Sequence, residues 1–145
     1  MPVICINPTD ETDVKLLNKL NLQNQDIRLF ISDNVSKEIT EKFIGKKAIG
    51  DLKDDSHIST ASSGAYCGIF METEEESQRS VFLEAIKNSS LHRIIWTSPY
   101  EPSEELTAIK NFVYIVCKEK HLAHEVILDF EGRAEVETEV INLIN

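Results

Sequence analysis

The sequence lacks any apolar stretch long enough to cross a membrane, and its first residues have neither the basic start nor the apolar run of a secretory signal peptide. Internal repeats and low-complexity tracts are also missing. Basic residues are scarce, with 15 Lys and Arg against 25 Asp and Glu, and the net charge is −10. Because this charge repels polyanions and anionic lipids, we expect no nucleic acid and no membrane among the partners. The missing signal peptide and membrane span predict a cytoplasmic location.

Cysteine is limited to Cys5, Cys67 and Cys117, which lie far apart among apolar neighbours. An odd, scattered set does not form a disulfide framework, so we expect buried, reduced thiols of the kind found in cytosolic proteins. The sequence has no nucleophile elbow, no Walker loop and no Cys-x-x-Cys pair. His121 and His124 are three residues apart, but no third metal ligand is evident, so we predict solvated histidines and no metal site.

What the sequence does contain is an ordinary globular composition, with 41% hydrophobic and 28% charged residues in 145. This fits one domain, residues 1–145, with one core. Short apolar runs predict strands at 3–6, 27–31, 47–49, 66–71, 93–97 and 126–130. Helical spacing and start signals predict helices beginning after Thr9 or Asp10 and at about 35–43, 56–62, 74–88, 102–122 and 132–144. The segment 112–116 is rich in β-formers, so a strand is an alternative there.

Alternation of apolar strands with helices predicts an α/β fold with a doubly wound parallel sheet, Rossmann-like and in three layers. We predict five or more strands in the order 3-2-1-4-5. In such sheets a ligand binds outside the carboxyl ends of the strands. Functional residues are therefore expected just after the first, second, third and fifth strands.

Two stretches of the chain carry a family resemblance. Gly50–Asp54 followed by residues 61–69, and Phe82–Ile86 followed by Leu91–Ser98, occur in the order and spacing of one family. Over roughly residues 3–130 the chain resembles the atypical short-chain dehydrogenase/reductases, in the branch of the nitrogen-metabolite-repression regulators. The resemblance implies an NAD(P)-binding domain that is truncated, because 145 residues leave out the extra substrate-binding segment of full-length members.

The resemblance implies four cofactor-contacting positions. Asn7 and Thr9 stand in the loop after the first strand, where the family holds the dinucleotide. Asp33, at the end of the second strand, stands where the family often places a ribose-contacting group, and Asp51 stands where it contacts adenine. Simpler alternatives are a turn residue for Asp33 and a helix cap for Asp51.

The resemblance also implies a catalytic set. Ser98 matches the family's serine, and Tyr114 with Lys118 matches the Tyr-x-x-x-Lys pair of proton donor and helper. On a helix this spacing would place Tyr114 and Lys118 on one face, where the lysine charge lowers the tyrosine pKa. Tyr114 also lies in an apolar run, so a core tyrosine is the alternative.

One family motif is missing. The family's loop after the first strand is rich in glycine, which lets the pyrophosphate approach the start of the next helix. Here residues 7–13 contain no glycine and three acids, Asp10, Glu11 and Asp13. We expect these acids to repel a pyrophosphate, or alternatively to complement the helix dipole. In both cases dinucleotide binding in the usual pose is expected to be impaired.

Our first hypothesis is a degenerate NAD(P)-binding-like domain that senses a ligand or binds a partner without turnover. The second is a small NAD(P)-dependent reductase that uses the serine, tyrosine and lysine named above. The third is a nucleotide-sensing regulatory domain that resembles those of potassium-conductance regulators, which share the Gly-Asp after the third strand. We also expect a homodimer built on the C-terminal half, because so short a chain leaves the outer face of its last strands uncovered.

Overall fold

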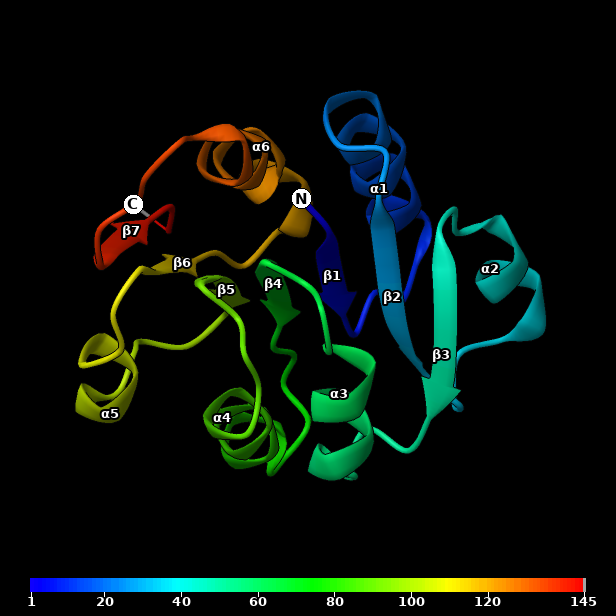
Figure 1. Cartoon of the computed structure of the whole chain (residues 1–145), viewed down its shortest axis with the longest axis horizontal. Coiled ribbons are helices and arrows are strands. Elements are labelled where there is room, and N and C mark those ends of the chain that lie inside the picture. Colours follow the sequence, from blue (N-terminus) through cyan, green and yellow to red (C-terminus); the bar gives the residue numbers. More distant parts are fainter. Residues whose placement is uncertain (145) are drawn as a thin grey trace.

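Seven parallel strands form one sheet in the order β3-β2-β1-β4-β5-β6-β7 in the computed structural model, which describes residues 1–144 (Figure 1). The strands are β1 (Val3–Ile6), β2 (Ile27–Ser32), β3 (Lys46–Gly50), β4 (Cys67–Met71), β5 (Arg93–Ser98), β6 (Phe112–Val116) and β7 (Glu139–Asn142). The helices are α1 (Glu11–Gln23), α2 (Lys37–Lys42), α3 (Asp55–Ala61), α4 (Gln78–Lys87), α5 (Glu104–Thr107) and α6 (His124–Gly132), with a 3-10 turn η1 (Lys120–Ala123). The doubly wound parallel sheet and the order 3-2-1-4-5 are confirmed.

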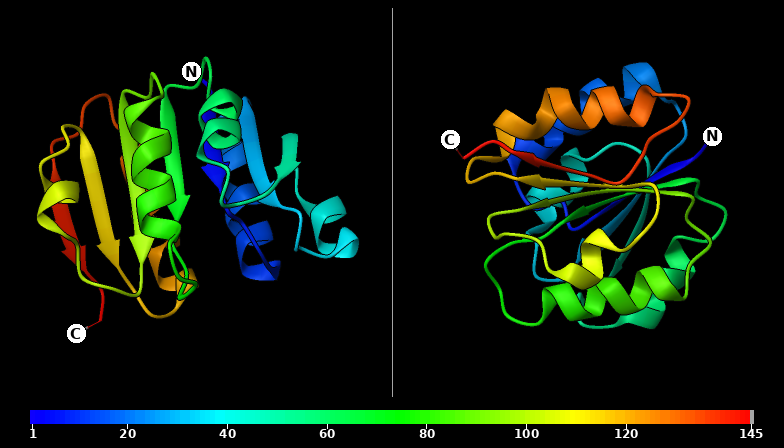
Figure 2. Two further views of the ribbon diagram at one scale, coloured as in Figure 1. Left: turned by 90° about the horizontal axis from the view of Figure 1, so that it is seen from below. Right: turned by 90° about the vertical axis from the view of Figure 1, so that its left-hand side faces the viewer.

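Helices cover the sheet on both faces, and each face has its own apolar core (Figure 2). Side chains alternate between the two faces along each strand. In β1, for example, Val3 and Cys5 pack with α1 and α6, whereas Ile4 and Ile6 pack with α3, α4 and α5. Because both faces are buried, the central strands are continuous apolar runs, which is why the sequence shows them clearly.

The C-terminal third differs from the sequence prediction. The predicted helix 102–122 is wrong: α5 ends at Thr107, and residues 112–116 form β6, the alternative that their β-branched and aromatic side chains favoured. The predicted strand 126–130 is wrong as well, because this segment lies within α6. Ile127 and Phe130 are one helical turn apart and both are buried, whereas a strand would have sent them to opposite faces.

The predicted helix 132–144 is also wrong. Residues 133–138 run in extended or irregular backbone to β7, which pairs with β6 at the edge of the sheet. Only Ile141 of this strand is half-buried, and the other three side chains are exposed. Most side chains of an edge strand can be polar because they face solvent, so the sequence of such a strand lacks the apolar run that identifies a buried strand.

All three cysteines are buried free thiols, as predicted. Burial raises the pKa of the Cys67 thiol to about 12 and also raises the pKa values of Cys5 and Cys117. A protonated, buried thiol is a poor nucleophile, so these residues are packing residues. Within residues 1–144, no helix has the length and apolar character to cross a membrane.

Candidate functional site

A pocket of about 680 Å³ opens at the carboxyl ends of β1, β2 and β4. In the sheet, β2 and β3 lie on one side of β1, and β4 lies on the other side (Figure 1). The pocket therefore lies where the strand order reverses. This is the position at which open α/β sheets bind ligands. We call it the switch-point pocket, and its lining is Asn7, Thr9, Ser32, Asn34, Val35, Ser36, Leu52, Thr73, Glu74, Glu75 and Gln78.

The loop after β1 turns sharply without glycine. Asn7 adopts a left-handed backbone with φ of 73°, a conformation that Asn tolerates better than most residues. Its side-chain amide donates to the carbonyl of Met71 at 2.8 Å, which ties the loop to the end of β4. The missing glycine therefore does not prevent the tight turn that the fold needs here.

The start of α1 is closed by carboxylates of the chain itself. Asp10 caps the helix and accepts a hydrogen bond from the amide of Asp13 at 3.2 Å. The buried carboxylate of Asp13 in turn accepts from the amide of Thr9 at 2.7 Å. Amides at a helix start are the groups with which proteins commonly hold phosphate oxygens. In this structure the amide of Asp13, in the first turn of α1, and the amide of Thr9, in the loop just before it, are bound to internal carboxylates.

The three acids of this loop are also paired with cations. The ammonium of Lys120 lies 2.9 Å from Asp13 Oδ2 and 3.5 Å from Asp10 Oδ2, and Lys42 forms an ion pair with Glu11. The predicted repulsion of a phosphate by three uncompensated charges is therefore weaker than the sequence suggests. The occupied amides are the stronger obstacle.

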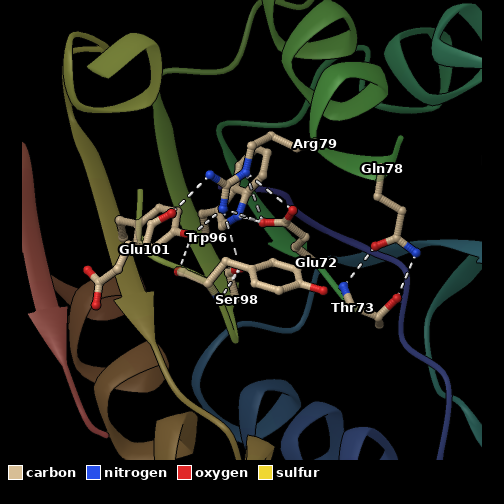
Figure 3. Close-up of polar contacts among 9 residues, drawn as sticks. Glu72, Thr73, Gln78, Arg79, Trp96, Ser98 and Glu101 are labelled. Carbon is tan, nitrogen blue, oxygen red and sulfur yellow. Dashed lines mark hydrogen bonds and ion pairs between the residues drawn. The ribbon is translucent and has the colours of Figure 1, made fainter. Parts of the chain in front are cut away.

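A polar network lies just beyond the end of β4, between the start of α4 and the strands β5 and β6 (Figure 3). Glu72 is 9% exposed and accepts from the guanidinium of Arg79 at 2.8 Å and from Trp96 Nε1 at 3.0 Å. Arg79 also donates to the backbone carbonyl of Glu101 at 3.0 Å. Trp96 is fully buried in the interior strand β5.

Tyr114 completes this network from inside β6. Its hydroxyl donates to the carbonyl of Tyr100 at 2.6 Å and accepts from Arg79. Burial raises the pKa of Tyr114 even though the charge of Arg79 acts in the opposite direction. The phenol is thus protonated, fully engaged and part of the core, which agrees with the simpler alternative for this residue.

The prediction that Tyr114 and Lys118 share one face of a helix is wrong, because residues 112–116 form a strand. Lys118 follows β6, is exposed, and lines a smaller pocket of about 170 Å³ together with Ser98. The hydroxyl of Ser98 accepts from the amide of Tyr100 at 3.0 Å and lies 3.5 Å from Arg79. Arg79, and not Lys118, is therefore the cation bonded to the tyrosine.

Asn7 and Thr9 line the switch-point pocket, whereas Asp33 and Asp51 do not. Asp33 is exposed in the turn after β2, and its amide donates to the carbonyl of Gly50. Asp51 accepts from the amide of Lys53 at 2.9 Å, so its local role is that of a turn residue. The cap of α3 is Asp54, and not Asp51.

Sequence reasoning missed the ion pair of Glu72 and Arg79. An acidic run before a helix is typical of a solvated helix start, and nothing in the sequence distinguishes Glu72 as the carboxylate of this run that is buried against Arg79. His124 was also mispredicted, since it is 6% exposed instead of solvated. No group of three or more His, Cys, Asp or Glu that could hold a metal is found within residues 1–144.

No protein-family model matches the chain, and no curated protein matches it. Among solved structures, a short-chain dehydrogenase/reductase (wide type) from Veillonella parvula in complex with NADP is similar, with a TM-score of 0.70 and 13% identity over 97% of this chain and 93% of that chain. The fold is Rossmann-like. A Rossmann-fold NAD(P)-binding family protein from Shigella flexneri gives a TM-score of 0.69 and 14% identity over 98% of this chain and 92% of that one. Identities this low establish the shared architecture and no more.

Proposed function

We propose that this Rossmann-like domain binds a small ligand reversibly in the switch-point pocket, in a sensing or partner-binding role, and transfers no hydride. The observation that carries the proposal lies at the start of α1, where the carboxylates of Asp10 and Asp13 accept from the amides of Asp13 and Thr9 and so occupy two of the donors nearest to where a pyrophosphate would bind. As they stand, these residues do not fit a bound dinucleotide. We therefore expect NADH and NADPH to bind weakly or not at all.

The surroundings of Tyr114 support a domain without turnover. A general acid must reach the substrate and release its proton near the working pH. The Tyr114 hydroxyl is held by Arg79 and by the carbonyl of Tyr100, and burial raises its pKa. Lys118 lies beyond the end of β6, and the cation bonded to the Tyr114 hydroxyl is Arg79.

The second candidate is an NAD(P)-dependent reductase that uses Ser98, Tyr114 and Lys118. It is favoured by one observation, which is that the similar structure from Veillonella parvula is a complex with NADP. This candidate requires the Asp13 carboxylate to leave the amide of Thr9 when the cofactor enters. Such a movement would also break the ion pair between Asp13 and Lys120.

Calorimetric titration of the whole chain with NADH and NADPH separates the two candidates. We expect no saturable heat below about 1 mM cofactor and no oxidation of the nicotinamide with carbonyl substrates. Micromolar binding that is lost in Asp33→Ala or Asp51→Ala would contradict the proposal, because it would mean that the family's cofactor contacts operate. Circular dichroism of both variants controls for folding.

A further inference from the structure

The charged side chains that line the switch-point pocket are all negative. Of the eleven described residues that line it, none is Lys, Arg or His, and the only ionisable side chains are Glu74 and Glu75. Both are exposed at the start of the segment that leads into α4. Proteins hold phosphate and carboxylate groups with Arg, with Lys or with open helix-start amides. This pocket presents carboxylates instead.

Two of the cations near the pocket are engaged by carboxylates, and the exposed Lys53 lines an adjoining pocket and not this one. Lys120 contacts the hydroxyl of Thr9 at 2.7 Å, but its charge is shared by Asp13 and Asp10. Arg79, one residue beyond the pocket in α4, is bonded to the carboxylate of Glu72. An anionic group that entered the pocket would meet the two glutamates without a compensating positive charge.

The rest of the lining suits an uncharged, hydroxyl-bearing molecule. Its polar groups are hydroxyls and side-chain amides, which both donate and accept hydrogen bonds. Val35 and Leu52 add an apolar surface, and a mixture of apolar walls with a few polar groups is typical of small-molecule sites. The volume of about 680 Å³ is within the usual range for such sites.

We propose that the ligand of the switch-point pocket carries no phosphate and is neutral or cationic, a hydroxyl- and amine-bearing compound of about the size of a nucleoside. The amine would lie beside Glu74 and Glu75, and the hydroxyls would bond to the side chains of Thr9, Asn34 and Thr73. This inference rests on the proposed function and states which ligand class the site accepts.

Three compounds of the same shape test the charge preference. They are 5′-amino-5′-deoxyadenosine, adenosine and adenosine 5′-monophosphate. At the 5′ position of the ribose the first carries a positive charge, the second is neutral and the third carries a negative charge. Each is titrated to about 10 mM into nitrogen-15-labelled protein while the amide signals of Asn34, Thr73 and Glu75 are followed by NMR. We expect affinity to fall from the amine to the alcohol to the phosphate, by roughly fivefold for each charge brought next to a carboxylate.

Two variants provide the matched control. Glu74→Gln combined with Glu75→Gln removes the charge of the pocket, and the three affinities should become nearly equal. Glu76→Gln removes a neighbouring charge that does not line the switch-point pocket, and the order should persist.

Tighter binding of the phosphate than of adenosine would overturn the inference. So would the absence of any signal change with either adenosine or its amino analogue. The proposed function fails by a different result, micromolar binding of NADH, so a preference for the monophosphate without NADH binding would refute only the ligand class.

Discussion

At the scale of single residues, His124 is a buried base without a bonding partner. Its Nε2 atom has no hydrogen-bond partner among the described residues, and the ring borders a cavity of about 10 Å³ beside Asp13. Burial lowers the pKa of His124, and the charges of Lys19 and His121 lower it further, whereas Asp13 and Glu125 act in the opposite direction. The imidazole is therefore expected to be neutral in the folded protein at neutral pH.

The free energy of unfolding should decrease as the pH falls through the unfolded-state pKa of His124, about 6.5. Above that value the ring is neutral in both states, and below it the unfolded chain takes up the proton first, because the folded-state pKa is lower. Urea unfolding at about pH 7.5 and about pH 5.5 measures the effect. His124→Gln should lose this part of the pH dependence, and His121→Gln, at an exposed position, should keep most of it, because burial is the main cause of the lowered pKa of His124. An identical pH dependence in wild type and His124→Gln would contradict the prediction.

At the scale of elements, Arg93 of β5 holds the C-terminal end of α6 through hydrogen bonds. It is 3% exposed, and its guanidinium donates to four backbone carbonyls, those of Phe130, Glu131, Arg133 and Ala134, at 2.7–3.1 Å. Carbonyls at the end of a helix lack partners within the helix and carry partial negative charge. One buried cation therefore fixes where α6 stops and where the chain turns toward β7.

Replacing Arg93 should loosen the C-terminal third more than the rest of the sheet. Arg93→Lys keeps the charge, but a single ammonium cannot reach four carbonyls in a fixed fork, so we expect a loss of about 2–3 kcal/mol in the free energy of unfolding. Hydrogen exchange should accelerate most in α6 and β7. Arg133→Lys, which changes an exposed i,i+4 pair with Asp129, is the control and should show neither effect. Exchange that accelerates evenly over all strands would refute this role.

The sequence predicts the first five strands because each ends at a turn signal, such as Asn7-Pro8 after β1, and because all except β3 are mainly apolar. It fails from residue 102 onward for a physical reason. Val126–Phe130 is equally apolar but too short for periodicity to separate a buried helix from a buried strand. The side chains of β7 are mostly exposed, so its sequence lacks a continuous apolar run. This segment forms a strand because its backbone pairs with β6.

The position of the candidate site could be predicted, because carboxyl ends of parallel strands meet at one edge of the sheet. Its chemistry could not. Asp13 was visible as one of three acids, but its pairing with Lys120 joins residues 107 positions apart. Likewise, the local pattern around Tyr114 fits a helix as well as a strand, and only packing against β5 decides between them.

At the scale of the whole molecule, the C-terminal edge of the sheet retains exposed apolar side chains. Val140 of β7 is 44% exposed and Ile144, just beyond it, is 42% exposed. The helix before β6, α5, has only four residues and ends at Thr107. The homodimer on the C-terminal half that the sequence predicts stays a prediction, and we place its centre at β7.

Light scattering of the wild-type chain should show a dimer at high micromolar concentration. Val140→Asp should shift it to the monomer, because a carboxylate in an apolar contact is unfavourable. Ile49→Asp is the matched control: Ile49 is 53% exposed on β3, at the opposite edge, and its replacement should leave the dimer intact. A wild-type monomer, or equal loss of the dimer in both variants, would refute this arrangement.

The closed start of α1 has one more consequence, which concerns assembly and not recognition. In a protein that binds a phosphate at this position, the free energy of cofactor binding adds to the stability of the fold. The start of the helix is then more stable in the bound form than in the free form. Here Asp13 and Lys120 supply the anion and its counter-ion from within the chain. If the proposed function holds, we expect the stability of this domain not to depend on the concentration of dinucleotide.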